Sequence, residues 1–430
     1  MYDLHGRRFE SSYLAIPILV LAASSCDRGD DENGKPLPDL DDDDVLYADL
    51  YPALGRSGRI RFAGRLVVEE KDDLAEISET TPLEESRQDE VESAPFALSV
   101  AGRTLQGVCD EEGFFELIAE GLALPPGEQE WTVGPREGGE PWGRARGTVL
   151  AEDDRGVVVT SDIDKTYLVA KFESAGGLAS LLRQKASDRV ALPGARELYR
   201  SIAATGRPIV FLSGSPRFFK RTLEAKFRAD ELAVSALHLK DLGGSIRQGG
   251  IASVTEQVGF KLEGLLQQRR NLPPAAPEIL LGDDSEADFV VYRIYRDAIS
   301  GRISAGSLAA RLQALGVSER DAGRAADLLR ELGDPPLAGP VLLAAIRRTG
   351  TPSERYSLDE YLDGDIVAVA DSFQLALVLA DRGHLDAAAA ARVRDAMVES
   401  GADRAALDAT AREAAGNGLF HEGVLEAAGR

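Results

Sequence analysis

The sequence predicts an α/β chain in which a Rossmann-like parallel sheet follows a small antiparallel β-sandwich. In residues 156–166, three valines run into two aspartates spaced i, i+2, as at the end of a buried strand. Two further apolar runs, 208–213 and 278–282, also end in polar residues and alternate with segments of helical spacing. This alternation is typical of right-handed crossovers between parallel strands. A helical insertion and a helical C-terminal tail complete the predicted fold.

Changes in composition along the chain predict its domain boundaries. Residues 27–46 are acidic, with Gly and Pro and almost no apolar residues, which is typical of a solvated linker. The predicted segments are a signal peptide with a lipobox at 1–26, the linker at 27–46, the sandwich-like domain at 47–152, the parallel-sheet domain at 153–380 with its helical insertion at 303–338, and the helical tail at 381–430.

Length and charge limit the classes of function. The chain has 430 residues, 44% of them hydrophobic, which is enough for two or three cores. Its formal charge is −23, and no segment has the density of Lys and Arg that a nucleic-acid-binding surface needs. We therefore expect no nucleic-acid partner. An anionic lipid or phosphate would be repelled unless a metal ion or a local basic patch intervenes.

The N-terminus resembles a secretion signal. Arg7 and Arg8 precede an apolar run at 13–23, which is too short to span a bilayer but fits the apolar region of a signal peptide. Residues 21–26 resemble a bacterial lipobox, in which Cys26 would be lipidated, although alanine stands three residues before it. The sequence thus predicts a membrane-anchored lipoprotein of the bacterial cell envelope. The alternatives are a plain cleaved signal, giving a soluble secreted or periplasmic protein, and a misassigned start codon.

Short alternating segments in residues 60–150 predict the sandwich. The clearest strands are 60–68, 96–100 and 113–118, separated by Gly and Pro clusters. The charged residues 69–92 between them are expected to be a surface excursion. With no catalytic constellation, this region is predicted to be a packing or docking module.

Helices and strands alternate after residue 162. Residues 193–203, 218–227 and 260–266 have helical spacing, 341–346 fit a further strand, and helix-rich sequence is expected from 365 onward. The basic run 217–228 fits either a solvated face or a contact with an anionic substrate.

Polar side chains follow the three buried strands. Asp162 and Asp164 end the first, Ser213 the second, and Asp283 the third. Ligands of open α/β sheets bind beyond the carboxyl ends of the strands. The two carboxylates can therefore hold a cation or act as nucleophile and acid. The alternative is that both aspartates are ordinary turn residues.

These motifs resemble the haloacid dehalogenase superfamily of aspartate-nucleophile phosphohydrolases. Residues 153–300 are most similar to the actin-patch-associated phosphatidate phosphatases. That family reads Ser-Asp-Ile-Asp-Asp-Thr, then Leu-Ser-x-Ser-Pro, then Gly-Asp-Ser-Gly-Glu-x-Asp, and the chain matches at most positions of 161–166, 212–216 and 282–288. Three positions depart from the pattern: Lys165 replaces an aspartate, and Asp284 and Ser285 stand where serine and glycine are usual.

The resemblance assigns a role to each catalytic residue. Asp162 would attack phosphorus and form an aspartyl-phosphate, which divides hydrolysis into two easier steps. Asp164 would protonate the leaving oxygen and later activate water. Ser213 and Lys261 would hold the phosphoryl oxygens. Lys240 is the alternative lysine, and Lys261 taken alone also fits the surface of a helix.

The resemblance also implies Mg²⁺, because phosphoryl transfer concentrates negative charge that a cation must offset. Asp162 and Asp283 are the expected oxygen ligands, and further carboxylates can complete the metal shell. The candidate metal ligands are Asp162, Asp164, Asp283, Asp284 and Asp288.

We therefore expect a Mg²⁺-dependent phosphatase acting on phosphatidate or a related phospholipid phosphomonoester. Short gaps between the motifs leave little room for a large cap domain, which favours a bulky or membrane-held substrate over an enclosed metabolite. A small phosphorylated metabolite is the alternative substrate. A catalytically inactive binding module is the alternative class, since Lys165 can pair with Asp162 or Asp164 and displace the metal.

Overall fold

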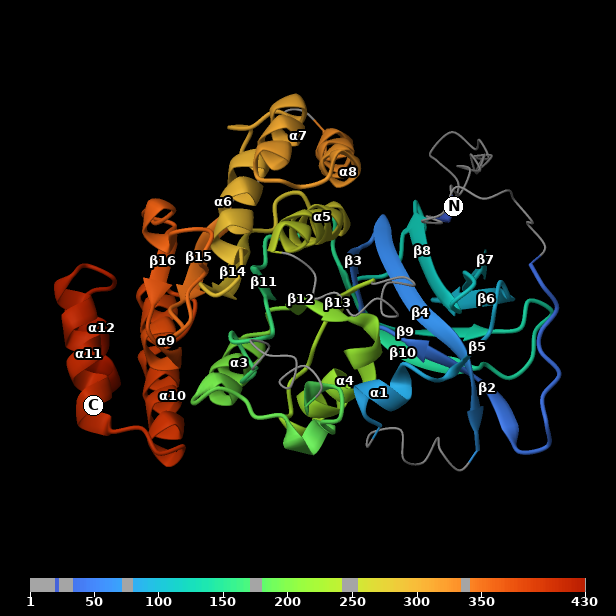
Figure 1. Ribbon diagram of the computed structural model, residues 1–430, viewed down its shortest axis with the longest axis horizontal. Helices are drawn as coiled ribbons and strands as arrows, with labels where there is room; N and C mark the ends of the chain where they lie inside the picture. Colours follow the sequence, from blue (N-terminus) through green and yellow to red (C-terminus); the bar gives the residue numbers. More distant parts are fainter. Residues whose placement is uncertain are drawn as a thin grey trace, which may run out of the picture.

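The computed structural model describes residues 20–22, 34–71, 80–170, 180–241, 254–333 and 341–429. Figure 1 shows two sheets side by side, with helices around one of them and at the C-terminal end. The predicted signal and lipobox, Cys26 included, lie outside the described residues apart from β1 (Val20–Ala22), which pairs with β8 (Phe114–Glu120). Among the described helices, none is long and apolar enough to cross a membrane.

The N-terminal sheet has ten strands in the order β1-β8-β4-β3-β10-β9-β6-β7, with β2 and β5 paired to β4. Its pairings are antiparallel except for β3 with β10. The remaining strands are β2 (Asp44–Leu50), β3 (Ala53–Arg56), β4 (Arg59–Glu70), β5 (Asp89–Glu90), β6 (Pro95–Val100), β7 (Arg103–Val108), β9 (Gly127–Gly134) and β10 (Gly143–Leu150).

This sheet folds over its own core, which confirms the antiparallel β-rich module. Buried and half-buried residues alternate along β8, so one face of the strand points inward. Phe62 of β4 packs on Trp131 of β9 with ring centroids 4.9 Å apart. One boundary was wrong: β2 begins at Asp44, so the predicted linker 27–46 overlaps the sheet by three residues.

The second sheet has six strands, all parallel, in the order β13-β12-β11-β14-β15-β16. The strands are β11 (Val158–Ser161), β12 (Ile209–Pro216), β13 (Ala236–Lys240), β14 (Glu278–Asp283), β15 (Val341–Arg347) and β16 (Ile366–Val369). The parallel sheet is as predicted, but the helix-rich sequence expected from residue 365 opens with strand β16.

Helices cover both faces of the parallel sheet. Residues of β14 alternate between two cores: Ile279 and Leu281 pack on one face, and Leu280 on the other. The first face carries α3 (Ala195–Ala203), α4 (Lys220–Ala229), α9 (Ser372–Asp381), α10 (Ala387–Glu399), α11 (Arg404–Gly416) and α12 (Glu422–Gly429). The second carries α5 (Val254–Asn271), α6 (Asp288–Ile299), α7 (Ala305–Ala314) and α8 (Glu319–Glu331).

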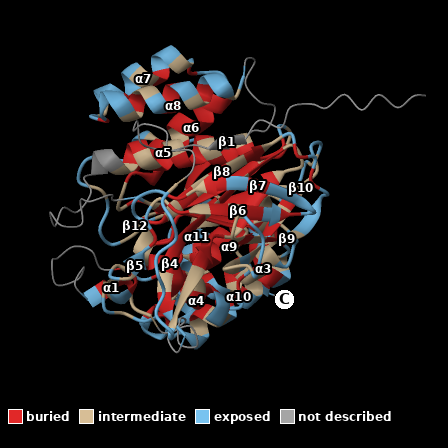
Figure 2. Ribbon diagram, turned by 90° about the vertical axis from the view of Figure 1, so that its right-hand side faces the viewer, coloured by how far each residue is buried: buried red, intermediate tan, exposed pale blue. Residues whose placement is uncertain are grey.

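The predicted insertion is the pair α7 and α8, which extends the layer of α5 and α6. Arg324 of α8 donates to Glu263 of α5 at 2.6 Å. In Figure 2, α7 and α8 expose their outer surfaces.

The basic run at 217–228 is a solvated face only in part, since Arg228 is exposed but two of its cations are buried. Lys220 and Arg221 of α4 are buried and bind carboxylates of the N-terminal domain. Lys220 Nζ donates to Asp49 Oδ1 at 2.6 Å, and Arg221 donates to Asp49 Oδ2 at 3.1 Å and to Glu69 Oε1 at 2.6 Å. Glu85 and Glu224 belong to the same group of charged residues.

The excursion expected at 69–92 also belongs partly to this contact. Its helix α1 (Pro82–Glu85) ends in Glu85, which is buried and accepts the backbone N–H of Arg221 at 3.2 Å. Burial, and then the charge of Asp49, raise the pKa of Glu85 well above its ordinary value. The N-terminal domain is therefore joined to the parallel-sheet domain through α4.

Candidate active site

The predicted site residues meet at the carboxyl edge of three adjacent strands. Strand β11 lies between β12 and β14, with Ser161 paired to Phe211 on one side and Leu281 on the other. The chain adds β12 and β13 on one side of β11 and then β14 to β16 on the other, so the edge is a topological switch point. Asp162 follows β11, Ser213 lies in β12 and Asp283 ends β14.

Lys261 of α5 reaches this edge and binds three carboxylates. Its Nζ lies 3.0 Å from Asp162 Oδ1, 3.1 Å from Glu286 Oε2 and 2.5 Å from Asp288 Oδ1. Burial lowers the pKa of Lys261, but Asp162, Asp288 and Glu286 outweigh it and raise that pKa well above its ordinary value. Of the two candidate lysines, Lys261 is therefore the one beside Asp162, while Lys240 ends β13, beyond Ser213.

Asp162 combines one bound and one unbound carboxylate oxygen. Oδ1 accepts from Lys261, whereas Oδ2 is buried and has no hydrogen-bond partner. Burial raises the pKa of Asp162 well above its ordinary value, and Lys261 acts in the opposite direction. Lys261 thus stabilises the ionised form of Asp162, which is the form that can act as a nucleophile.

Asp164 is oriented by hydroxyl groups at the end of β12. Its Oδ2 accepts from Ser215 Oγ at 2.8 Å and lies 3.4 Å from Ser213 Oγ. Burial raises the pKa of Asp164, and the bond from Ser215 lowers it. Ser215 was not among the predicted site residues, but its hydroxyl contacts the candidate general acid directly.

Asp162 and Asp283 are the candidate ligands that each keep a buried carboxylate oxygen without a protein partner. Asp283 Oδ2, like Asp162 Oδ2, is buried without a partner, while Oδ1 accepts from Ser285 N at 2.6 Å. Burial, followed by the charge of Asp288, raises the pKa of Asp283 to about 7. Unsatisfied carboxylate oxygens are the ligands that Mg²⁺ prefers. The residues present therefore fit this metal.

The other candidate ligands are already bound to protein groups. Asp284 Oδ1 accepts from the backbone N and the hydroxyl of Thr349, both at 2.7 Å. Asp288 accepts from Lys261 through Oδ1 and from Asp283 N through Oδ2, at 3.1 Å for the latter. Asp162, Glu286 and Asp288 place oxygens within 4.8 Å of one another, but the ammonium of Lys261 contacts all three. These carboxylates therefore surround the lysine.

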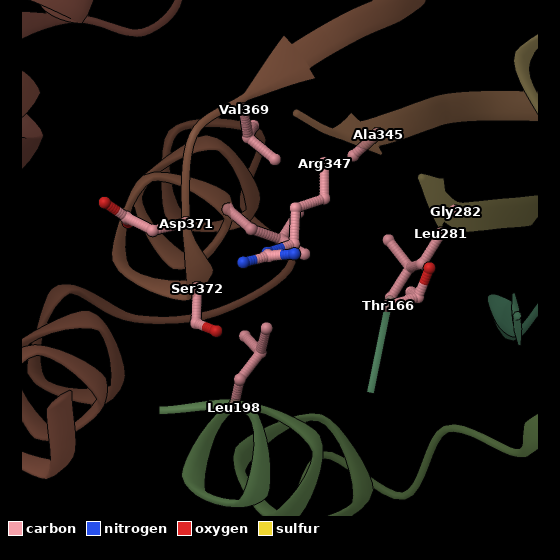
Figure 3. Close-up of a pocket in the computed structure, with 10 residues that line it drawn as sticks. Thr166, Leu198, Leu281, Gly282, Ala345, Arg347, Val369, Asp371 and Ser372 are labelled. Atoms are coloured by element: carbon pink, nitrogen blue, oxygen red, sulfur yellow. The ribbon is translucent and has the colours of Figure 1, made fainter. Parts of the chain in front are cut away.

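Lys165, the departure from the family pattern, sits in a left-handed turn. Its φ is 60°, its Nζ donates to Thr351 Oγ1 at 3.0 Å, and its carbonyl accepts from Arg347 at 3.1 Å. Figure 3 shows the Arg347 side chain in a small cavity lined also by Thr166 and Asp371. Arg347 thus stabilises the turn after Asp162 and Asp164 through its hydrogen bond to the carbonyl of Lys165.

Glu286 is a site residue that the sequence reasoning did not select. It binds Lys261 and accepts from Gln257 Nε2 at 3.3 Å. Its position three residues after Asp283, in the motif that ends β14, was the available signal. Its pairing with Lys261 depends on the position of α5 over the strand ends, which local sequence does not determine.

Comparison with known proteins identifies one family. Residues 157–307 match the family described as "Phosphatidate phosphatase APP1, catalytic domain", which confirms the resemblance read from the motifs. No curated protein matches the chain.

Among solved structures, a HAD family hydrolase from Deinococcus radiodurans R1 with bound phosphate and sodium is 16% identical. The match covers 54% of this chain and 99% of that one, with a TM-score of 0.27. A carbohydrate acetylesterase from Xanthomonas citri is 10% identical over 78% of this chain and 74% of that one, with a TM-score of 0.23. These scores are too low to support a conclusion about fold or activity.

Proposed function

We propose that the chain is a Mg²⁺-dependent phosphoric monoester hydrolase with Asp162 as nucleophile, because residues 157–307 match the phosphatidate phosphatase catalytic-domain family. The observation that carries this proposal is the Asp162 carboxylate, with one oxygen on Lys261 and the other free. Asp164, held by Ser215, stands two residues away as the acid.

The proposed reaction has two steps. In the first, a carboxylate oxygen of Asp162 forms a bond to phosphorus while the bond from phosphorus to the leaving oxygen breaks, and Asp164 gives its proton to that oxygen. In the second, Asp164 takes a proton from water as the water oxygen attacks phosphorus. Inorganic phosphate leaves and the Asp162 carboxylate is restored.

Lys261 and Ser213 are the proposed phosphoryl-binding groups, and Asp162 and Asp283 the proposed holders of the metal. Bound there, Mg²⁺ would offset the charge that gathers on the phosphoryl oxygens. Asp288 and Glu286 orient Lys261 through their short contacts with its ammonium. Asp284 orients the segment that begins at Thr349.

Phosphatidate or a related phospholipid phosphomonoester is the proposed substrate. The family match supports it, and so do two exposed valines beside the site. Val169 and Val190 are 41% and 61% exposed, and Val169 N donates to Val190 O at 2.9 Å. Leu168, next to Val169, forms an isolated β-bridge with Asp164, so the two valines lie close to the candidate acid. An apolar edge beside a charged site suits an amphiphilic substrate.

Attachment to the bacterial cell envelope through lipidated Cys26 belongs to the same proposal. It rests on the sequence of residues 1–26, in which Arg7 and Arg8 precede an apolar run and a lipobox-like segment. A membrane-held enzyme would meet a phospholipid substrate at the surface to which it is anchored.

The test is hydrolysis of para-nitrophenyl phosphate and of phosphatidate in mixed micelles, with Mg²⁺ or with chelator. Asp162→Asn should lower kcat on the order of 10³-fold or more, because it removes the nucleophile. Asp327→Asn, an exposed aspartate of α8, is the matched control and should leave kcat unchanged.

Each outcome has a defined meaning. Hydrolysis of phosphatidate that needs both metal and Asp162 supports the whole proposal. Hydrolysis of the small ester alone retains the mechanism and removes the lipid substrate. Full activity in Asp162→Asn rules out the nucleophile, and no hydrolysis by the wild type favours a binding module.

A further inference from the structure

Arg189 is a buried guanidinium that lacks the carboxylate its burial would require. Only 5% of the residue is exposed, and Nε and Nη2 have no hydrogen-bond partner. Its guanidinium stacks on the ring of Phe219, 4.8 Å from the centroid. A charge buried without a partner is destabilising, so such a group is rarely kept for the fold alone.

The other buried arginines of the described residues show what is missing. Each has a carboxylate within ion-pair distance, whereas Arg189 has none. The six pairs are Arg59 with Glu120, Arg65 with Glu90, Arg221 with Asp49, Arg269 with Glu278, Arg296 with Asp363 and Arg394 with Asp408. Arg189 is therefore exceptional within this chain.

The backbone turns Arg189 inward beside the candidate general acid. Arg189 follows the 3-10 turn η3 (Ala186–Asp188) in an extended conformation, and the next residue, Val190, points outward and is 61% exposed. Ala191 pairs with Leu168, which in turn bridges Asp164. The segment carrying Arg189 thus lies against the catalytic loop.

The charges acting on Arg189 come from Asp164 and Glu85. Burial lowers the pKa of the guanidinium, and these two carboxylates oppose that shift. Neither carboxylate forms an ion pair with Arg189. Asp164 accepts a hydrogen bond from Ser215 Oγ, and Glu85 accepts one from Arg221 N. Nε and Nη2 of Arg189 thus remain without partners, on a segment whose backbone lies against the loop that carries Asp164.

We propose that Arg189 is an anion-binding residue of the active site, which donates to an oxygen of the substrate's phosphoryl group through its free N–H groups. This rests on the proposed phosphatase function and adds to it a substrate contact outside the family's motifs. A planar guanidinium with several donors suits phosphate oxygens. Stacking on Phe219 fixes the plane of the group before substrate arrives.

The experiment measures binding of inorganic phosphate by calorimetry with Mg²⁺ present, and thermal unfolding, for the wild type, Arg189→Met and Arg189→Lys. We expect the Met variant to unfold at the wild-type temperature or above, since an apolar side chain replaces an unpaired buried charge. Its Kd for phosphate should rise about 10-fold or more through loss of charge-assisted bonds. Arg189→Lys should lie between the two.

Kinetics supply the matching readout. In Arg189→Met the KM for para-nitrophenyl phosphate and the Ki for phosphate should rise together. Arg196→Gln, which removes an exposed arginine of α3, is the control and should change neither. An unchanged Kd in Arg189→Met would overturn the proposal. So would a Met variant that fails to fold, because the guanidinium would then serve the fold.

The two proposals can fail separately. A wild type that binds phosphate but hydrolyses no ester would overturn the phosphatase, and the Kd comparison would still decide the role of Arg189. An active wild type whose Kd does not depend on Arg189 would overturn only the inference drawn here.

Discussion

Removing Asp49 tests how the N-terminal domain is joined to the catalytic sheet. Asp49 binds Lys220 through Oδ1 and Arg221 through Oδ2, and the three side chains are 11%, 2% and 4% exposed. Burial raises the pKa of Asp49, but Lys220 and Arg221 outweigh it and hold that pKa below its ordinary value. Asp49→Asn leaves an amide between two buried cations, to which it can offer only one acceptor.

The expected loss of stability follows from the remaining contacts. Removing one partner of a buried ion pair costs about 3–5 kcal/mol. Lys220 keeps Glu224 at 2.8 Å, and Arg221 keeps Glu69 at 2.6 Å. We therefore expect the lower limit, about 3 kcal/mol.

The assay is urea denaturation followed by circular dichroism, with turnover of para-nitrophenyl phosphate measured in parallel. Because α4 follows the end of β12, which bears Ser213 and Ser215, kcat should fall as well. The control is Glu92→Gln, which breaks the exposed pair with Lys35 and should change neither quantity. A cost below about 1 kcal/mol, the value of an exposed pair, would refute the reasoning.

Two further predictions concern a glycine and a histidine. In Gly282→Ala the new Cβ would lie 2.5 Å from Asp288 Oδ2, so we expect destabilisation of about 1–3 kcal/mol and a lower kcat. The control is Gly323→Ala, which has open space around it and should retain full activity. An equal kcat in the two variants would contradict this account. Burial first, then Arg61, lowers the pKa of His238 to about 4, so the unfolded chain binds the extra proton between that value and about 6.5. The stabilisation should therefore be fully present above pH 6.5 and be lost on acidification. The free energy of unfolding should fall by about 1.4 kcal/mol at pH 5.5, which is more than its fall in His238→Gln. Denaturation curves at pH 7.5 and 5.5 that change equally in both proteins would disprove this prediction.

The strand-end residues of the site could be predicted because they depend on local sequence. Asp162, Ser213 and Asp283 each follow a short apolar run, and parallel strands bring their carboxyl ends to one edge. The family resemblance added Lys261, whose place between two motifs fits a helix crossing over that edge. These predictions needed only the order of elements.

Other features depend on contacts between distant segments. Asp49 and Lys220 are 171 positions apart, so the sequence alone does not show that part of the run at 217–228 is buried against the N-terminal domain. The burial of Arg189 also cannot be predicted from the sequence, in which Ser187 and Asp188 precede it and an apolar run, 190–193, follows it. Strand β16 was missed because its four-residue apolar run leads into α9, and short apolar runs do not separate strand from helix.

Trapping the covalent intermediate tests the central claim most directly. Wild type and Asp162→Asn would be mixed with para-nitrophenyl phosphate and Mg²⁺, quenched, treated with borohydride and digested for mass spectrometry. Borohydride reduces an aspartyl-phosphate and releases phosphate, which marks the nucleophile. The account predicts the reduced mass on the wild-type peptide that contains Asp162 and its absence from the variant. The mark on another aspartate, or hydrolysis without any mark, would contradict it.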